Sequence, residues 1–281
     1  AVKFWIVRIW RLLYISAKMD LLWLLRDAKY AAIGILSDLI SGVSMAAGVF
    51  FMALRFGGVG GMSTDEVLFM LAYNTLVTGL FLIFCGGNNG HISRIIGRGQ
   101  LEHLYLQPLS LKIQLLTSGF MPFSGSANLL VGAVLLGAAM GRLALPVTVS
   151  FLAGLCCCLF LTLAVILALS YLFATAAFWA PVAAEEISSY VIKTTGQISA
   201  YPLSGMPRAL QWPLMTALPT GLMAWFPALL LLGKPPMGLS GAYLPVFTIF
   251  LSLLAGAFFR KGLQYYAQKG IHRYLPYGYR R

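Results

Sequence analysis

Residues 147–178 read VTVSFLAGLCCCLFLTLAVILALSYLFATAAF and contain no charged residue. A helix needs about 20 consecutive apolar residues to cross a membrane, so this stretch is long enough for one tilted span. Five further stretches approach or exceed that length: 31–54, 67–85, 113–140, 209–232 and 243–259. The sequence therefore predicts an all-α membrane protein with about six transmembrane helices.

The composition excludes a water-soluble globule. The chain is 59% hydrophobic and only 10% charged, whereas soluble domains carry about 25% charged residues. The net charge of +12 would suggest nucleic acid in a soluble protein, but here the basic residues flank apolar runs, as membrane topology requires. We therefore expect membrane lipid, and no nucleic acid, among the partners.

The loop charges predict the orientation. With the N-terminus inside, 17 Lys and Arg residues lie in inner segments and only Arg55, Arg142 and Lys234 lie outside. Cytoplasmic loops carry the excess of positive charge. An even number of spans then places both termini in the cytoplasm, with the protein in the plasma (inner) membrane.

The chain divides into three parts. In residues 1–29, six basic residues from Lys3 to Lys29 fall on one helical arc and the apolar residues, among them Trp5 and Trp23, lie mostly outside it. This pattern predicts an amphipathic helix in the inner interface, or one packed on protein. Residues 30–262 form the transmembrane domain, and residues 263–281 form a basic cytoplasmic tail.

Nucleotide and catalytic motifs are missing from the sequence. No phosphate-binding loop occurs, and the single Gly-Lys step, at Gly233, falls in an outer loop. His91, His103 and His272 are all assigned to cytoplasmic segments, so no span contains a histidine to activate a serine. We expect no catalytic residue, metal site or cofactor in this chain, and any ATP and Mg²⁺ must bind to a partner.

Several polar or helix-breaking residues lie within the predicted spans. Asp38 is the one carboxylate, and it is either a substrate-path or gating residue or a neutral or paired structural group. Asn74 and Asn128 are expected to form helix–helix hydrogen bonds. Pro219 and Pro227 make the fifth stretch either a kinked span or a broken, re-entrant element.

The connection between the second and third stretches contains a short amphipathic segment. Between residues 93 and 108, apolar residues such as Ile95 and Leu101 alternate with Arg94, Arg98 and Glu102, and Pro108 ends the segment. This pattern predicts a cytoplasmic helix that projects from the bilayer and docks on a soluble partner.

Four features together resemble an ABC-2-type (type V exporter-like) permease that works with a separate ATPase. The first is the amphipathic helix before the first span. The others are the segments GQLEHLYLQPLS at 99–110, YPLSGMP at 201–207 followed by Leu-Pro at 218–219 and Pro-Ala at 227–228, and GLQYYAQKG at 262–270. One departure is Gln107, where the family often has Arg before the proline.

The resemblance implies a coupling helix that contacts an ABC ATPase subunit, with Arg94, Arg98, Gly99, Leu101, Glu102, Tyr105, Gln107 and Pro108 as the candidate contacts. It also implies a homodimer, or a heterodimer with a sister permease. Substrate would pass between the two permeases, along a path for which the candidates are Asp38, Asn74, Pro219, Trp225 and Pro227.

The predicted function is therefore the permease subunit of an ATP-binding-cassette exporter. Its substrate would be apolar or amphipathic, such as a drug-like molecule, a lipid, a glycolipid or a peptide, because the chain is rich in aromatic residues and methionine. The alternatives are an intramembrane enzyme, for which no catalytic pair is found, and a passive channel, for which the spans contain too few polar residues.

Overall fold

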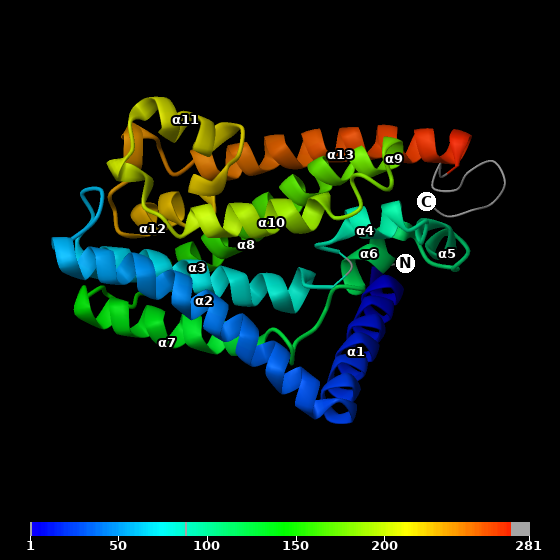
Figure 1. The fold of residues 1–281 in the computed structure, drawn as a ribbon, viewed down its shortest axis with the longest axis horizontal. Helices are drawn as coiled ribbons and strands as arrows, with labels where there is room; N and C mark the ends of the chain where they lie inside the picture. The colour runs from blue at the N-terminus through cyan, green and yellow to red at the C-terminus, as the bar shows by residue number, and fades with distance from the viewer. Residues whose placement is uncertain (1, 88, 271–281) are drawn as a thin grey trace.

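The computed structural model describes residues 2–87 and 89–270, and side chains are described for all of these except residues 2–6, 41 and 45. The end of the predicted basic tail, residues 271–281, and the side chains of Lys3 and Trp5 thus lie outside the described part. Figure 1 shows a bundle of long helices with short helices at both ends. The helices are α1 (Val2–Arg26), α2 (Ala28–Phe56), α3 (Thr64–Cys85), α4 (Ile92–Gly97), α5 (Leu101–Tyr105), α6 (Leu111–Thr117), α7 (Ser126–Arg142), α8 (Val149–Ala174), α9 (Ala176–Trp179), α10 (Ile187–Ser199), η1 (Leu203–Gly205), α11 (Arg208–Thr216), η2 (Thr220–Leu222), α12 (Trp225–Leu231), η3 (Pro236–Gly238) and α13 (Tyr243–Lys269).

Helix α3 forms the centre of the bundle and packs closely against α7. Gly125, Gly132 and Ala139 recur every seven residues, so they lie on one face of the helical path. A Cβ atom at Gly132 would lie only 2.5 Å from the backbone nitrogen of Leu76 in α3. Small residues therefore allow the two backbones to approach, as they do in membrane helix pairs.

The membrane class is confirmed. Four helical segments of the described chain are long and apolar enough to cross a membrane: α2, α3, the continuous run of α8 and α9 (Val149–Trp179), and α13. The bent pair of α11 with η2–α12 would make a fifth if it were counted as one span. The predicted count of six is not confirmed.

The third predicted span, residues 113–140, is interrupted. Helix α6 ends at Thr117 and α7 begins at Ser126. The buried carboxylate of Asp20 in α1 accepts hydrogen bonds from the backbone nitrogens of Phe123 (2.8 Å) and Ser124 (3.1 Å) and from the Ser124 hydroxyl. These bonds satisfy backbone groups that the break leaves without helical partners, so the break depends on a residue from the N-terminal helix.

The fifth predicted span, residues 209–232, is also broken. Helix α11 and the segment 220–231 are bent by 74° relative to each other, with Pro219 just before the second segment. Both halves contact the same end of the bundle: the Tyr243 hydroxyl at the start of α13 donates to the Met215 carbonyl (3.3 Å), and Lys234 after α12 pairs with Glu66 at the start of α3. Of the two alternatives left open by the sequence, the geometry favours the re-entrant element.

Helix α10 runs through the bundle in place of that span, next to α8 (Figure 1). Near its start, the Ser188 backbone N–H donates to Ser93 Oγ in α4 (3.1 Å). Just after its end, Gly205 lies against Gly60 in the loop between α2 and α3, where a Cβ atom on Gly60 would lie 2.5 Å from the Gly205 nitrogen. With six spans and the N-terminus inside, the loop charges place residues 180–208, between the fourth and fifth stretches, on the cytoplasmic side. This prediction is wrong, because α10 packs against α8 and is too short and polar to be found by hydropathy.

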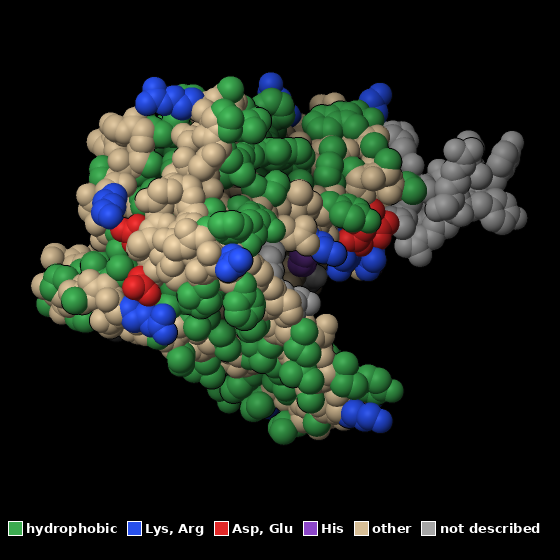
Figure 2. All heavy atoms as spheres, turned by 60° about the vertical axis from the view of Figure 1, so that its left-hand side comes forward, with side chains coloured by type: hydrophobic (Ala, Val, Ile, Leu, Met, Phe, Trp, Pro, Cys, Tyr) green, Lys and Arg blue, Asp and Glu red, His purple; other side chains and the backbone are tan. Residues whose placement is uncertain are grey.

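Helices α1 and α2 form an arm that extends from the bundle (Figure 1). In α1, Ser16 Oγ donates to the Thr117 carbonyl (3.1 Å), so part of the helix packs on protein. Other positions are exposed and apolar, including Trp10 and Trp23. Figure 2 shows hydrophobic side chains over most of this arm. One face of α1 thus packs on protein, and another presents apolar side chains that suit the membrane interface.

Candidate functional site

The predicted coupling segment 93–108 is two short helices and not one. Helix α4 ends at Gly97 and α5 begins at Leu101, and between them Gly99 adopts a left-handed conformation with φ of 72°. A residue other than glycine would be strained there. Ile95 and Leu101 are buried in a cluster with residues of α8, α9 and α13. The expectation of a single projecting helix is therefore wrong, since α4 is packed into the protein.

Helix α4 is joined to the start of α10 by an ion-pair cluster of Arg94, Arg98, Glu185 and Glu186. Arg94 donates from Nε to Glu186 Oε1 (2.8 Å) and from Nη2 to Glu186 Oε2 (2.6 Å), and Arg98 Nε donates to Glu185 Oε1 (2.7 Å). The Arg94 hydrogen bonds lower the pKa of Glu186, and they raise that of Arg94 in turn. Both predicted arginines are thus engaged within the chain.

Neutral hydrogen bonds extend the same junction. Ser93 Oγ donates to the Glu185 carbonyl (2.8 Å), and Ser189 Oγ donates to Glu186 Oε2 (3.0 Å). Because the hydroxyl of Ser189 has only one hydrogen, its 3.0 Å contact with His91 must be donated by the His91 Nδ1–H. Burial, followed by the nearby Arg94, lowers the pKa of His91, so the ring is neutral in this network.

Helix α5 and the turn after it present the exposed surface of this end. Glu102, Tyr105, Gln107 and Pro108 are exposed, whereas Leu101 is fully buried and acts in packing. The unpredicted neighbour Leu106 is 84% exposed, which is unusual for an apolar side chain beside charged ones. The Tyr266 hydroxyl of α13 donates to Glu102 Oε1 (3.1 Å), so α5 is also connected to the last helix.

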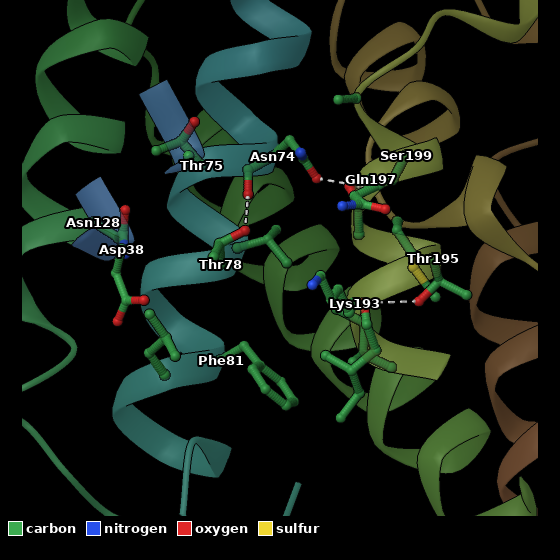
Figure 3. A pocket seen from close by; sticks show the side chains of 18 of the residues that line it. Asp38, Asn74, Thr75, Thr78, Phe81, Asn128, Lys193, Thr195, Gln197 and Ser199 are labelled. Carbon is green, nitrogen blue, oxygen red and sulfur yellow. Dashed lines mark hydrogen bonds between the residues drawn. The ribbon is translucent and has the colours of Figure 1, made fainter. Parts of the chain in front are cut away.

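A cavity of about 490 Å³ lies between α2, α3 and α10. Figure 3 shows its polar side chains, which come from α2 (Asp38), α3 (Asn74, Thr75, Thr78), α7 (Asn128) and α10 (Lys193, Thr195, Gln197, Ser199). Ser199 Oγ donates to Asn74 Oδ1 (3.0 Å), which confirms the helix–helix hydrogen bond expected of Asn74. The cavity thus brings together two of the five predicted path residues, Asp38 and Asn74.

The other three path candidates lie elsewhere. Pro219, Trp225 and Pro227 are buried, and none of them lines this cavity. Trp225 donates from Nε1 to Ser204 Oγ (2.7 Å) and borders a smaller cavity of about 360 Å³ at the α11–α12 end, together with Glu66 and Lys234. These residues therefore build the re-entrant end of the bundle and not the larger cavity.

Sequence reasoning missed Lys193, Glu185 and Glu186. All three lie in the segment that was assigned to a cytoplasmic connection. One signal was available: four of the eight acidic residues form two adjacent pairs, at 65–66 and 185–186, and the second pair falls in this segment. Within the described ranges, no group of three or more His, Cys, Asp or Glu side chains could hold a metal ion.

A bundle of membrane-length apolar helices around a partly polar cavity defines a multi-pass integral membrane protein. A family model described as "ABC-2 family transporter protein" matches residues 40–270, most of the chain. The chain belongs to this family and is a membrane component of an ABC transporter, which is not itself the catalytic part. Neither the curated proteins nor the solved structures gave a match.

Proposed function

We propose that this chain is the permease subunit of an exporter whose ATP and Mg²⁺ bind to a separate ABC ATPase subunit. The exposed surface of α5 and the following turn would contact that subunit, with Glu102 and Tyr105 at its centre. Two permeases, identical or related, would form the membrane part, and an apolar or amphipathic substrate would leave the cytoplasm between them. The candidate path begins at the cavity of Asp38 and Asn74.

One observation supports this proposal most directly, the connection from α4 to the wall of the cavity. The ion-pair cluster and the Ser93 hydrogen bonds join α4 to the first turn of α10, and α10 then provides Lys193, Thr195 and Ser199 to the cavity. A displacement of α4 by a closing ATPase would therefore also displace one wall of the cavity. Transport needs such an element with two arrangements that ATP binding can bias.

The charge distribution supports cytoplasmic termini. Helix α10 places Lys193 at the wall of the larger cavity, and Arg208 lies at the start of α11. With these two removed, fifteen of the twenty basic residues still belong to segments that the sequence predicts to be cytoplasmic, and four belong to the opposite side. The bias still follows the positive-inside rule.

The test is reconstitution of the full chain with the ABC ATPase that is co-expressed with it. Glu102→Ala and Leu106→Ser should reduce co-purification of the ATPase and substrate-stimulated ATP hydrolysis, while membrane insertion is unchanged. Tyr266→Phe is the matched control, because it removes the internal hydrogen bond of Glu102 and leaves the carboxylate available. ATP hydrolysis by the purified chain alone, or undiminished stimulation in both α5 variants, would contradict the proposal.

A further inference from the structure

Two opposite charges face the same cavity from different helices. Asp38 lies on α2 and Lys193 on α10, and in Figure 3 the α3 side chains Asn74 and Thr78 lie between them. Asp38 is ten residues from the start of α2 and Lys193 is six residues from the start of α10. At about 1.5 Å per residue, Asp38 is about 15 Å and Lys193 about 9 Å along its helix, so neither charge lies at a helix start.

Neither charge has a partner in the described part of the chain. No hydrogen bond or ion pair is formed there by the Asp38 carboxylate or the Lys193 ammonium. Charged residues within membrane spans are costly, and they usually face a water-filled cavity or pair with each other. Both side chains are exposed, so each charge is available to a bound molecule.

Apart from His91 and Ser189, most of the remaining wall is apolar. Val77 and Phe81 of α3, Ile166 of α8 and Met223 near α12 line the cavity beside the polar groups. Small-molecule sites have this composition, mostly apolar with a few placed polar groups, and volumes of about 300–1,000 Å³. At about 490 Å³, the cavity suits a single amphiphilic molecule, or the polar part of a longer one.

Resting on the proposed export function, we propose that this cavity binds a zwitterionic amphiphile, with its ammonium group at Asp38 and its phosphate or carboxylate group at Lys193. An amphiphile with only a positive charge would leave Lys193 unpaired beside a like charge. An amphiphile with only a negative charge would do the same at Asp38. Discrimination by such unmatched charges is a common source of specificity.

The experiment is equilibrium binding to the purified full-length chain in nonionic detergent. Three radiolabelled probes with the same hydrocarbon chain are compared: lysophosphatidylethanolamine (zwitterionic), lysophosphatidylglycerol (anionic) and an alkylamine (cationic). Because partly exposed ion pairs contribute up to about 1 kcal/mol each, the zwitterion should bind roughly fivefold more tightly than either of the others.

Two variants and two controls assign this preference to the charges. Asp38→Asn should lower affinity for the zwitterion to about that of the anionic probe, and Lys193→Gln should lower it to about that of the cationic probe. Ser37→Ala and Thr194→Ala alter exposed neighbours that do not line the cavity, and they should bind all three probes as the wild type does.

Equal affinity of the wild type for the three probes would overturn this inference, even if a variant failed to fold. Equal loss of all three probes in both variants would overturn it as well. Binding needs no ATPase, so this outcome is separate from the fate of the proposed function. A chain that prefers the zwitterion but never associates with an ATPase would refute export and leave the cavity assignment standing.

Discussion

Neutralising Arg94 should uncouple α4 from α10. In Arg94→Gln, both charge-assisted hydrogen bonds to Glu186 are lost, while Arg98 keeps its 2.7 Å bond to Glu185 and a 3.8 Å contact with Glu186. The contact between α4 and the start of α10 is weakened but not lost, since the Ser93 hydrogen bonds remain. We therefore expect a folded protein whose response to ATP is impaired.

The magnitude follows from exposure and geometry. The side chains of Arg94 and Glu186 are 40% and 36% exposed, and pairs of that exposure contribute about 0.2–1 kcal/mol. The two-pronged arrangement places this pair near the upper limit. A coupling energy of about 1 kcal/mol should lower the melting temperature by roughly 2 °C in a chain of this size.

The assay is a double-mutant cycle with Arg94→Gln, Glu186→Gln and both together. Melting of the full chain in detergent measures the pair, and substrate-stimulated ATP hydrolysis in the assembled complex measures coupling. Strictly additive melting shifts would show that the pair contributes nothing to stability. If both single variants kept wild-type stimulation, the role assigned to the ion-pair cluster would be refuted.

Three further outcomes are expected. Gly132→Val should lower the yield of monodisperse protein, because overpacking of well-packed positions costs about 1–3 kcal/mol. Gly137→Val is the control and should not lower the yield, since nothing lies within 4 Å of a Cβ atom there. Equal yields of the two variants would contradict the close approach of α3 and α7. Asp20→Ala should destabilise the chain by about 2 kcal/mol in a thermal melt, because three hydrogen bonds at the break before α7 lose their acceptor; an unchanged melt would contradict this. Burial and the nearby Arg94 lower the pKa of His91 in the folded chain below 6.5. The free energy of unfolding should therefore fall as the pH drops from 6.5 toward that lowered pKa, and His91→Gln should reduce this loss. An identical pH profile in the variant would show that His91 does not take part in the network.

The α4–α5 region shows where sequence reasoning succeeded and where it failed. The segment was located correctly between the second and third apolar stretches, because Pro108 and the amphipathic pattern are local signals. Its shape was not, since Gly99 divides it and Ile95 is buried by helices far away in the sequence. The partners of Arg94 and Arg98 lie about 90 residues later, and no local pattern connects them.

The sequence by itself determined that this chain resides in a membrane. Long uncharged stretches can be buried only in lipid or in protein, so the membrane class, the four long apolar helices and the family resemblance followed from composition and motif. Only the tertiary structure decided the path of α10 and the re-entrant turn at Pro219, and through them the cavity between Asp38 and Lys193. The reason is physical: hydropathy measures how a segment interacts with its solvent. A short polar helix inside a bundle is stabilised by side chains of other helices, such as Asn74 for Ser199, and these neighbours exist only once the chain has folded.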